Sequence, residues 1–67
     1  MNIQINSEQK NVPDGTSVHE FVLNILQLDP AGKAIAVNET IVPKHLWETT
    51  LLQENDRMLV IKACSGG

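Results

Sequence analysis

The sequence has little cysteine, few aromatic rings and few basic residues. Its single cysteine, Cys64, excludes an internal disulfide, so no covalent bridge stabilises the fold. Five basic residues against eight acidic ones give a net charge of -3, and the only aromatic residues are Phe21 and Trp47. A protein that binds nucleic acid needs a basic surface for phosphates and often aromatic platforms for bases. We therefore expect no nucleic-acid partner.

Long apolar runs are missing as well. No segment approaches the roughly 20 apolar residues that a membrane-spanning helix needs. The chain starts with alternating polar and apolar residues, not with the charged start and continuous apolar stretch of a signal peptide. These two observations predict a cytoplasmic protein without a membrane partner.

The sequence also lacks the common signatures of catalysis and metal binding. His19 and His45 have no spacing to each other or to Cys64 that is typical of a metal site. Phosphate-binding loops and a recognisable Ser/His/Asp set are absent. A chain of 67 residues forms one thin core and leaves few residues for a buried pocket. We expect a binding module or a carrier, not an enzyme, with no metal and no cofactor bound.

Alternating apolar residues predict several short strands. Met1, Ile3 and Ile5 alternate with polar residues, as in a strand with one buried face. A turn at 7–9 and a return strand at 10–12 would complete a hairpin. Further strands are predicted at 33–37, at 40–42 after a tight turn at 38–39, and at 57–63 after a turn at 53–56, while residues 44–47 form one irregular turn.

The segment after Pro13 predicts an amphipathic helix. Ser17 and Glu20 have the spacing of a capping box, and Thr16 is the other candidate for the cap. Apolar residues then follow at the spacing of one helix face, namely Val18, Phe21, Val22, Ile25 and Leu26. Pro30 cannot continue a helix, so the helix is expected to end at 29–32. Together these elements predict an α+β fold with one main helix on one face of a sheet.

The last strand has apolar residues on both sides, although one helix covers only one face. Met58 and Val60 are predicted to face the helix. The opposite face is predicted to be a partner-docking face, flat and apolar, formed by Leu59, Ile61, Ala63, Ala34 and Ala36. The alternative is that loops fold over this face or that these residues are ordinary exposed apolar side chains.

We expect a domain at 1–63 and a flexible tail at 64–67 that ends in Gly66 and Gly67. A carboxylate must be activated before a nucleophile can attack it, commonly as an acyl-adenylate. Residues without a Cβ fit a narrow enzyme channel and adopt backbone angles closed to other residues. Gly67 would then carry the reacting carboxylate, whereas the alternative is an inert, frayed terminus.

The whole chain resembles the ThiS family of ubiquitin-like sulfur carriers. The residues that carry the resemblance are the helix start at 16–20, the block Ala36-Val37-Asn38-Glu39-Thr40-Ile41-Val42-Pro43, the following Trp47, the stretch 54–57 and the terminal pair Gly66-Gly67. The resemblance implies a β-grasp fold with a mixed sheet of four or five strands.

The same resemblance implies a function in the synthesis of the thiazole moiety of thiamine. Gly67 is expected to be adenylated by a ThiF-type enzyme that uses ATP and magnesium, and then to become a thiocarboxylate. The expected partners are this enzyme, a sulfur donor protein and the thiazole synthase ThiG. The chain would be a consumed and recycled co-substrate, monomeric when free.

Two alternatives stay open within this interpretation. The chain could be a molybdopterin-type sulfur carrier or a ubiquitin-like modifier that joins its glycine to lysines. Cys64 and Ser65 also depart from the small or apolar, unreactive residues expected at these positions. Cys64 is either an inert small side chain or a thiol that takes part in sulfur transfer.

Overall fold

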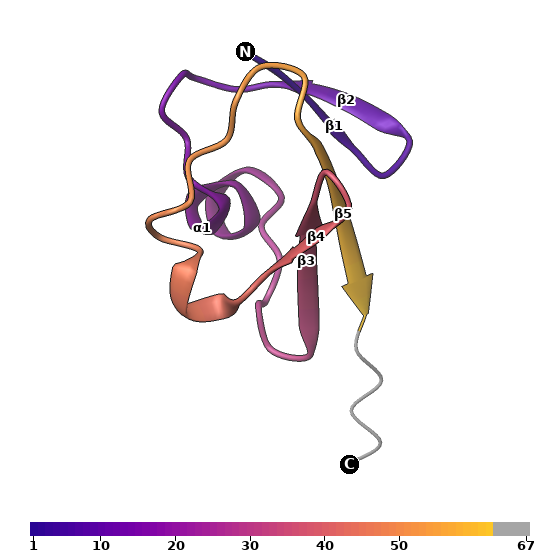
Figure 1. Cartoon of the computed structure of the whole chain (residues 1–67), viewed down its shortest axis with the longest axis vertical. Helices are drawn as coiled ribbons and strands as arrows, with labels where there is room; N and C mark the ends of the chain where they lie inside the picture. The colour runs from indigo at the N-terminus through magenta and orange to yellow at the C-terminus, as the bar shows by residue number, and fades with distance from the viewer. Residues whose placement is uncertain (63–67) are drawn as a thin grey trace.

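The computed structural model describes residues 1–62. These residues form a mixed sheet of five strands with the order β2-β1-β5-β3-β4 (Figure 1). In chain order the elements are β1 (Asn2–Ile5), β2 (Glu8–Asn11), α1 (Val18–Glu20), η1 (Phe21–Ile25), β3 (Lys33–Val37), β4 (Thr40–Val42), η2 (Lys44–Leu46) and β5 (Arg57–Lys62). The predicted α+β fold with one main helix on one face of the sheet is confirmed, with five strands.

The central strand is β5. It pairs in parallel with β1 and antiparallel with β3, while β2 and β4 form the edges of the sheet. Figure 1 shows the helical segment on one side of the sheet, with β5 running from the N-terminal end of the molecule to the opposite end. Among residues 1–62, no helix is long and apolar enough to span a membrane.

The first hairpin differs from the prediction in its boundaries. Glu8 and Gln9 belong to strand β2 and not to the turn, because Ile5 already pairs with Glu8. The loop consists of Asn6 and Ser7, and Asn6 adopts a φ of 54°. Asparagine tolerates this left-handed conformation better than most residues, which allows the shorter turn.

The helix begins as predicted. Ser17 is the N-cap, and its Oγ accepts a hydrogen bond from the Glu20 backbone N–H at 3.1 Å. The Glu20 side chain accepts one from the Ser17 backbone N–H at 3.4 Å, which completes the capping box. Thr16, the other candidate, instead donates its hydroxyl to the Pro13 carbonyl at 2.7 Å.

The helix ends earlier than predicted. Its second half, Phe21–Ile25, is a π-helix, and Leu26 donates its N–H to the Phe21 carbonyl at 2.8 Å. Gln27 then adopts a φ of 55°, which stops the helix before Pro30 is reached. The expectation of an end at 29–32 was therefore wrong, because a left-handed glutamine carries no sequence signal comparable to glycine or proline.

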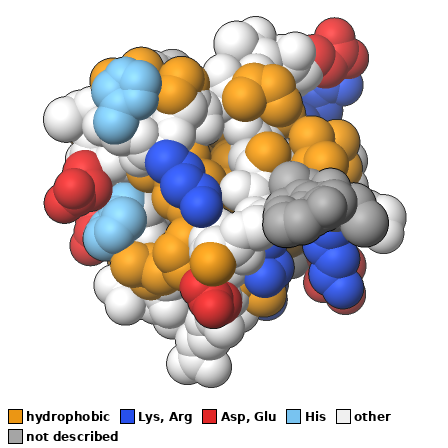
Figure 2. All heavy atoms as spheres, turned by 90° about the horizontal axis from the view of Figure 1, so that it is seen from below, with side chains coloured by type: hydrophobic (Ala, Val, Ile, Leu, Met, Phe, Trp, Pro, Cys, Tyr) orange, Lys and Arg blue, Asp and Glu red, His pale blue; other side chains and the backbone are white. Residues whose placement is uncertain are grey.

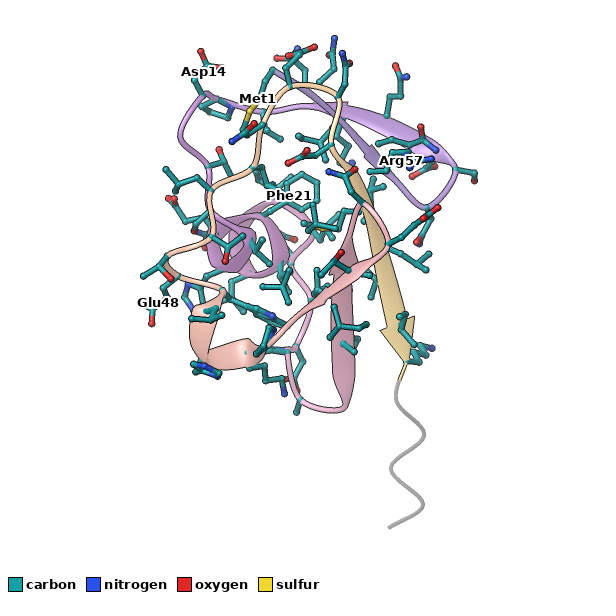
Figure 3. All side chains as sticks on the ribbon, in the orientation of Figure 1. Met1, Asp14, Phe21, Glu48 and Arg57 are labelled. Carbon is teal, nitrogen blue, oxygen red and sulfur yellow. The ribbon has the colours of Figure 1, made fainter. Side chains whose placement is uncertain are left out.

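The core lies between the helix and the sheet. Phe21 points from the helix into this space (Figure 3) and is fully buried. The other buried apolar residues are Ile3, Ile5, Val12, Val18, Val22, Ile35, Ala36, Trp47, Leu52 and Met58. Trp47 is held by a hydrogen bond from its Nε1 to the Val42 carbonyl at 2.8 Å. The predicted apolar stripe of the helix thus forms one wall of the core.

Asn38 fastens the β3–β4 hairpin to the start of β5. Asn38 and Glu39 form the turn with φ values of 51° and 70°. The Asn38 Oδ1 accepts the Arg57 N–H at 3.0 Å, and its Nδ2 donates to the Asp56 Oδ1 at 2.9 Å. Because Arg57 and Leu59 lie on the same side of β5, this turn also fixes one margin of the open sheet face.

Candidate functional site

Strand β5 separates its apolar side chains as predicted. Met58 is 2% exposed and Val60 is half-buried against the core, whereas Leu59 is 49% exposed and Ile61 is 36% exposed. Alternate residues of a strand point to opposite faces of the sheet. The fold therefore uses one side of β5 for its core and leaves the other side open.

The alanines of β3 lie beside these exposed residues. The antiparallel register pairs Ala36 with Leu59 and Ala34 with Ile61. Ala34 is half-buried, and Ala36 is only 6% exposed because the longer side chains around it rise above its methyl group. Ala36 instead lines a hollow of about 170 Å³ together with Asn6, Glu39, Arg57, Met58 and Leu59. The open face is therefore hollowed at this point and not flat.

Ile41 is an exposed residue that the sequence analysis missed. It pairs with Ala36 across the β3–β4 hairpin and is 55% exposed. The signal was available, because Val42 packs against the core and its neighbour in an alternating strand must face the other way. We name the set Ile41, Leu59, Ile61, Ala34 and Ala36 the open-face patch.

The charged margin of this patch contains one ion pair. Arg57 Nη2 lies 3.9 Å from Glu39 Oε2, and their side chains are 60% and 85% exposed. Figure 3 shows Arg57 near the start of β5. An exposed pair of this kind contributes little to stability, typically below about 1 kcal/mol. Both charges thus remain available for contacts with another protein.

Metal binding finds no support in the described part of the chain. Within residues 1–62, no group of three or more His, Cys, Asp or Glu side chains is placed to hold a metal ion. The remaining candidate site residues, Ala63, Cys64, Ser65, Gly66 and Gly67, lie outside the described residues. Their predicted roles stay predictions.

Comparison with known proteins decides the family. The ThiS family model matches residues 3–67. The chain belongs to the ThiS family. Over its full length it is 34% identical to the sulfur carrier protein ThiS of Escherichia coli, and the match also covers 100% of that protein. It is 33% identical over 67 residues to the uncharacterized protein ycf40 of Porphyra purpurea, of which it covers 93%.

The same fold is found in a solved member of the ThiS family. The crystal structure of the thiamine biosynthesis protein ThiS from Geobacter metallireducens superimposes with a TM-score of 0.85, at 20% identity and with 100% of both chains covered. This likeness confirms the β-grasp architecture expected from the resemblance. The family match extends through Gly67, so it includes the positions outside the described residues.

Proposed function

We propose that this member of the ThiS family carries sulfur for thiamine biosynthesis on the carboxylate of Gly67. The observation that carries the proposal is the match of the family model through Gly67, together with full-length similarity to the E. coli sulfur carrier protein. In this function the chain is a co-substrate of other enzymes and is not itself a catalyst.

The chemistry starts with an unreactive carboxylate. A ThiF-type enzyme with bound MgATP joins a Gly67 carboxylate oxygen to the α-phosphate, and pyrophosphate leaves. A sulfur nucleophile at the oxidation level of sulfide then attacks the acyl carbon and displaces AMP. The product is a Gly67 thiocarboxylate, whose sulfur is passed to the thiazole synthase. A residue without a Cβ before Gly67 eases entry into a narrow channel, as Gly66 provides.

The open-face patch is the surface proposed to dock these enzymes. Three exposed apolar side chains, Ile41, Leu59 and Ile61, lie on adjacent strands around the recessed alanines. A cluster of this kind signals a protein partner more strongly than scattered apolar residues do. The patch extends along β5, the strand that leads into the C-terminal segment, so a partner on it lies near Gly67.

Intact mass spectrometry tests the proposal. The full chain is incubated with a ThiF-type enzyme, MgATP and sulfide, and the expected product is heavier by the difference between a sulfur and an oxygen atom. Fragmentation should place this gain on Gly67. A chain extended by one residue after Gly67 is the matched control. It should remain unmodified at Gly67, because the carbonyl of this glycine then belongs to a peptide bond and no free carboxylate is left there.

Two outcomes would contradict the proposal. An unchanged mass with an enzyme that modifies the E. coli carrier would remove the sulfur-carrier function. Accumulation of covalent conjugates on lysines of other proteins, with no thiocarboxylate, would instead identify a ubiquitin-like modifier.

A Cys64→Ala variant that still forms the thiocarboxylate at the normal rate would assign Cys64 no part in the reaction.

A further inference from the structure

A pocket lies on the helix-covered side of the sheet, near the end where β5 finishes. Its volume is about 670 Å³, which is within the range of about 300–1,000 Å³ typical of ligand pockets. Leu26, Leu28 and Val60 supply apolar walls, and the charged residues that line it are Lys33, Lys62 and Glu8. The remaining lining residues are Ile5, Asn6 and Ser7. This pocket is separate from the open-face patch, which lies on the other side of the sheet.

The two lysines of the pocket are direct cross-strand neighbours. The register of β3 and β5 pairs Lys33 with Lys62. Like charges placed directly opposite each other destabilise a sheet. Within residues 1–62 the ion pairs are Met1 with Asp14 and Arg57 with Glu39, so no described carboxylate lies within ion-pair distance of either lysine.

Lys33 is nevertheless positioned. Its Nζ donates a hydrogen bond to the Asp29 carbonyl at 3.0 Å. A neutral carbonyl orients the ammonium group but does not cancel its charge. In a chain with a net charge of -3, the pair is therefore a local positive site beside an apolar wall. Figure 2 views the molecule from the end where β5 finishes and shows both basic and acidic side chains on this surface.

The position of the pair limits what can approach it. Five residues follow Lys62 in the sequence. A fully extended chain spans at most about 3.6 Å per residue, so the Gly67 carboxylate lies within about 18 Å of Lys62 in any conformation. An enzyme that acts on Gly67 therefore works within about 18 Å of Lys62, which brings the pocket within reach of its surface.

We propose that the pocket receives an acidic side chain, flanked by an apolar one, from the enzyme that activates Gly67. This inference rests on the proposed function and names a second contact of the same partner. The carboxylate accepts charge-assisted hydrogen bonds from the two ammonium groups and relieves their repulsion. The apolar side chain packs against Leu26, Leu28 and Val60. The partner thus holds the end of β5 from both faces of the sheet.

Charge reversal tests the inference in the full chain. Lys62→Glu and Lys33→Glu are compared with Lys44→Glu, which changes the net charge equally but lies outside the pocket. Calorimetric titration with the ThiF-type enzyme should give at least about tenfold weaker binding for each pocket variant and little change for the control. The thermal midpoint of Lys62→Glu should stay equal or rise, because an opposite-charge pair replaces two lysines. Lys33→Glu gains the same pair but also loses the hydrogen bond to the Asp29 carbonyl, so its midpoint should lie below that of Lys62→Glu.

A third variant shifts affinity in the other direction. Among residues 1–62, Glu8 is the acidic residue that lines the pocket, so Glu8→Gln should strengthen binding by about twofold. Raising the salt concentration should weaken binding of the unmodified chain more than that of Lys62→Glu, because fewer charges then contribute.

Several results would overturn the inference. These are pocket variants that bind the enzyme within twofold of the unmodified chain, a control with the same loss as the pocket variants, or a concentration-dependent dimer abolished by Lys62→Glu. Saturable binding of phosphate alone, undisturbed when the enzyme is added, would assign the pocket to a small anion instead. If the unmodified chain forms the thiocarboxylate and the variants bind normally, only this inference fails. If the unmodified chain is never modified, the proposed function and this inference fail together.

Discussion

The two faces of strand β5 have nearly the same amino-acid chemistry but different environments. Met58 and Val60 face the helix and are buried or half-buried, whereas Leu59 and Ile61 face outward and are exposed. The helix-covered face gives the domain its stability. The open face is exposed and adds little to that stability, and we propose contact with another protein as the reason for its apolar residues. In this proposal one strand serves folding on one side and recognition on the other.

The largest effect is expected from the same charge placed on either face of β5. Met58→Asp buries an unpaired carboxylate in the core and should unfold the domain, whose total stability is only about 3–10 kcal/mol for this length. Leu59→Asp should stay folded, within about 1 kcal/mol of the unmodified chain, because the side chain remains in water. Circular dichroism and urea titration measure both.

The affinity of the open-face variant for its partner enzyme sharpens the comparison. Leu59→Asp should reduce affinity for the ThiF-type enzyme at least about tenfold, because it places a charge in the centre of an apolar contact. Leu51→Asp is a matched control, since Leu51 is 57% exposed and lies outside β5. Loss of folding in Leu59→Asp would show that the open face belongs to the core.

A medium effect is expected at the hairpin that borders the open face. Asn38→Ala removes two side-chain hydrogen bonds and places alanine at a φ of 51°, so it should cost about 1–3 kcal/mol of unfolding free energy. Asn38→Gly keeps the backbone freedom and loses only the hydrogen bonds. Equal urea midpoints for the two variants would mean that the left-handed backbone conformation contributes nothing to the stability lost in Asn38→Ala.

A smaller effect is expected on the helix-covered side. Ser17→Ala removes the cap of the helix and should cost about 1 kcal/mol. Ser17→Thr keeps a side-chain hydroxyl at the cap and should retain most of the stability. Because the cap is remote from the open face, partner affinity should not change in either variant; a parallel loss of affinity would show that the two faces are coupled.

The smallest effect on stability is expected for the exposed ion pair. Glu39→Gln removes the partner of Arg57 and should change the unfolding free energy by less than about 0.5 kcal/mol. Its effect should appear in the association rate with the partner, measured by stopped flow at low salt. A large loss of stability would contradict the view that this margin is free for recognition.

Much of this division could be predicted from the sequence. The alternation around Ile3 and Ile5, the capping box at Ser17 and the inward direction of Met58 follow from local periodicity and cap chemistry, and each is confirmed. The helix end at Gln27 was missed because its left-handed conformation depends on the π-turn before it. Local sequence pattern indicates what a residue prefers, whereas this turn is closed by a hydrogen bond from the Leu28 N–H to the Val22 carbonyl at 2.9 Å.

Other features could not be predicted without the register of the sheet. Ile41 joins the open-face patch because it pairs with Ala36, and Lys33 meets Lys62 because β3 and β5 are antiparallel with one particular alignment. Pairing between distant strands is set by the whole core and by turn geometry. Leu59 and Ile61 do lie beside Ala36 and Ala34, while the docking role of these residues stays a prediction. The hollow at Ala36 and the lysine pair emerged only from the structure.

The parallel pairing of β1 with β5 has a consequence for the newly made chain. Asn6 and Val60, which are 54 positions apart in the sequence, are joined by a hydrogen bond from the Val60 N–H to the Asn6 Oδ1. Because the central strand β5 is the last of the five strands and pairs with the first, residues 57–62 must leave the ribosome before the sheet can close. A chain that stops before residue 57 therefore lacks the central strand of the sheet, and with it the exposed Leu59 and Ile61 of the open-face patch.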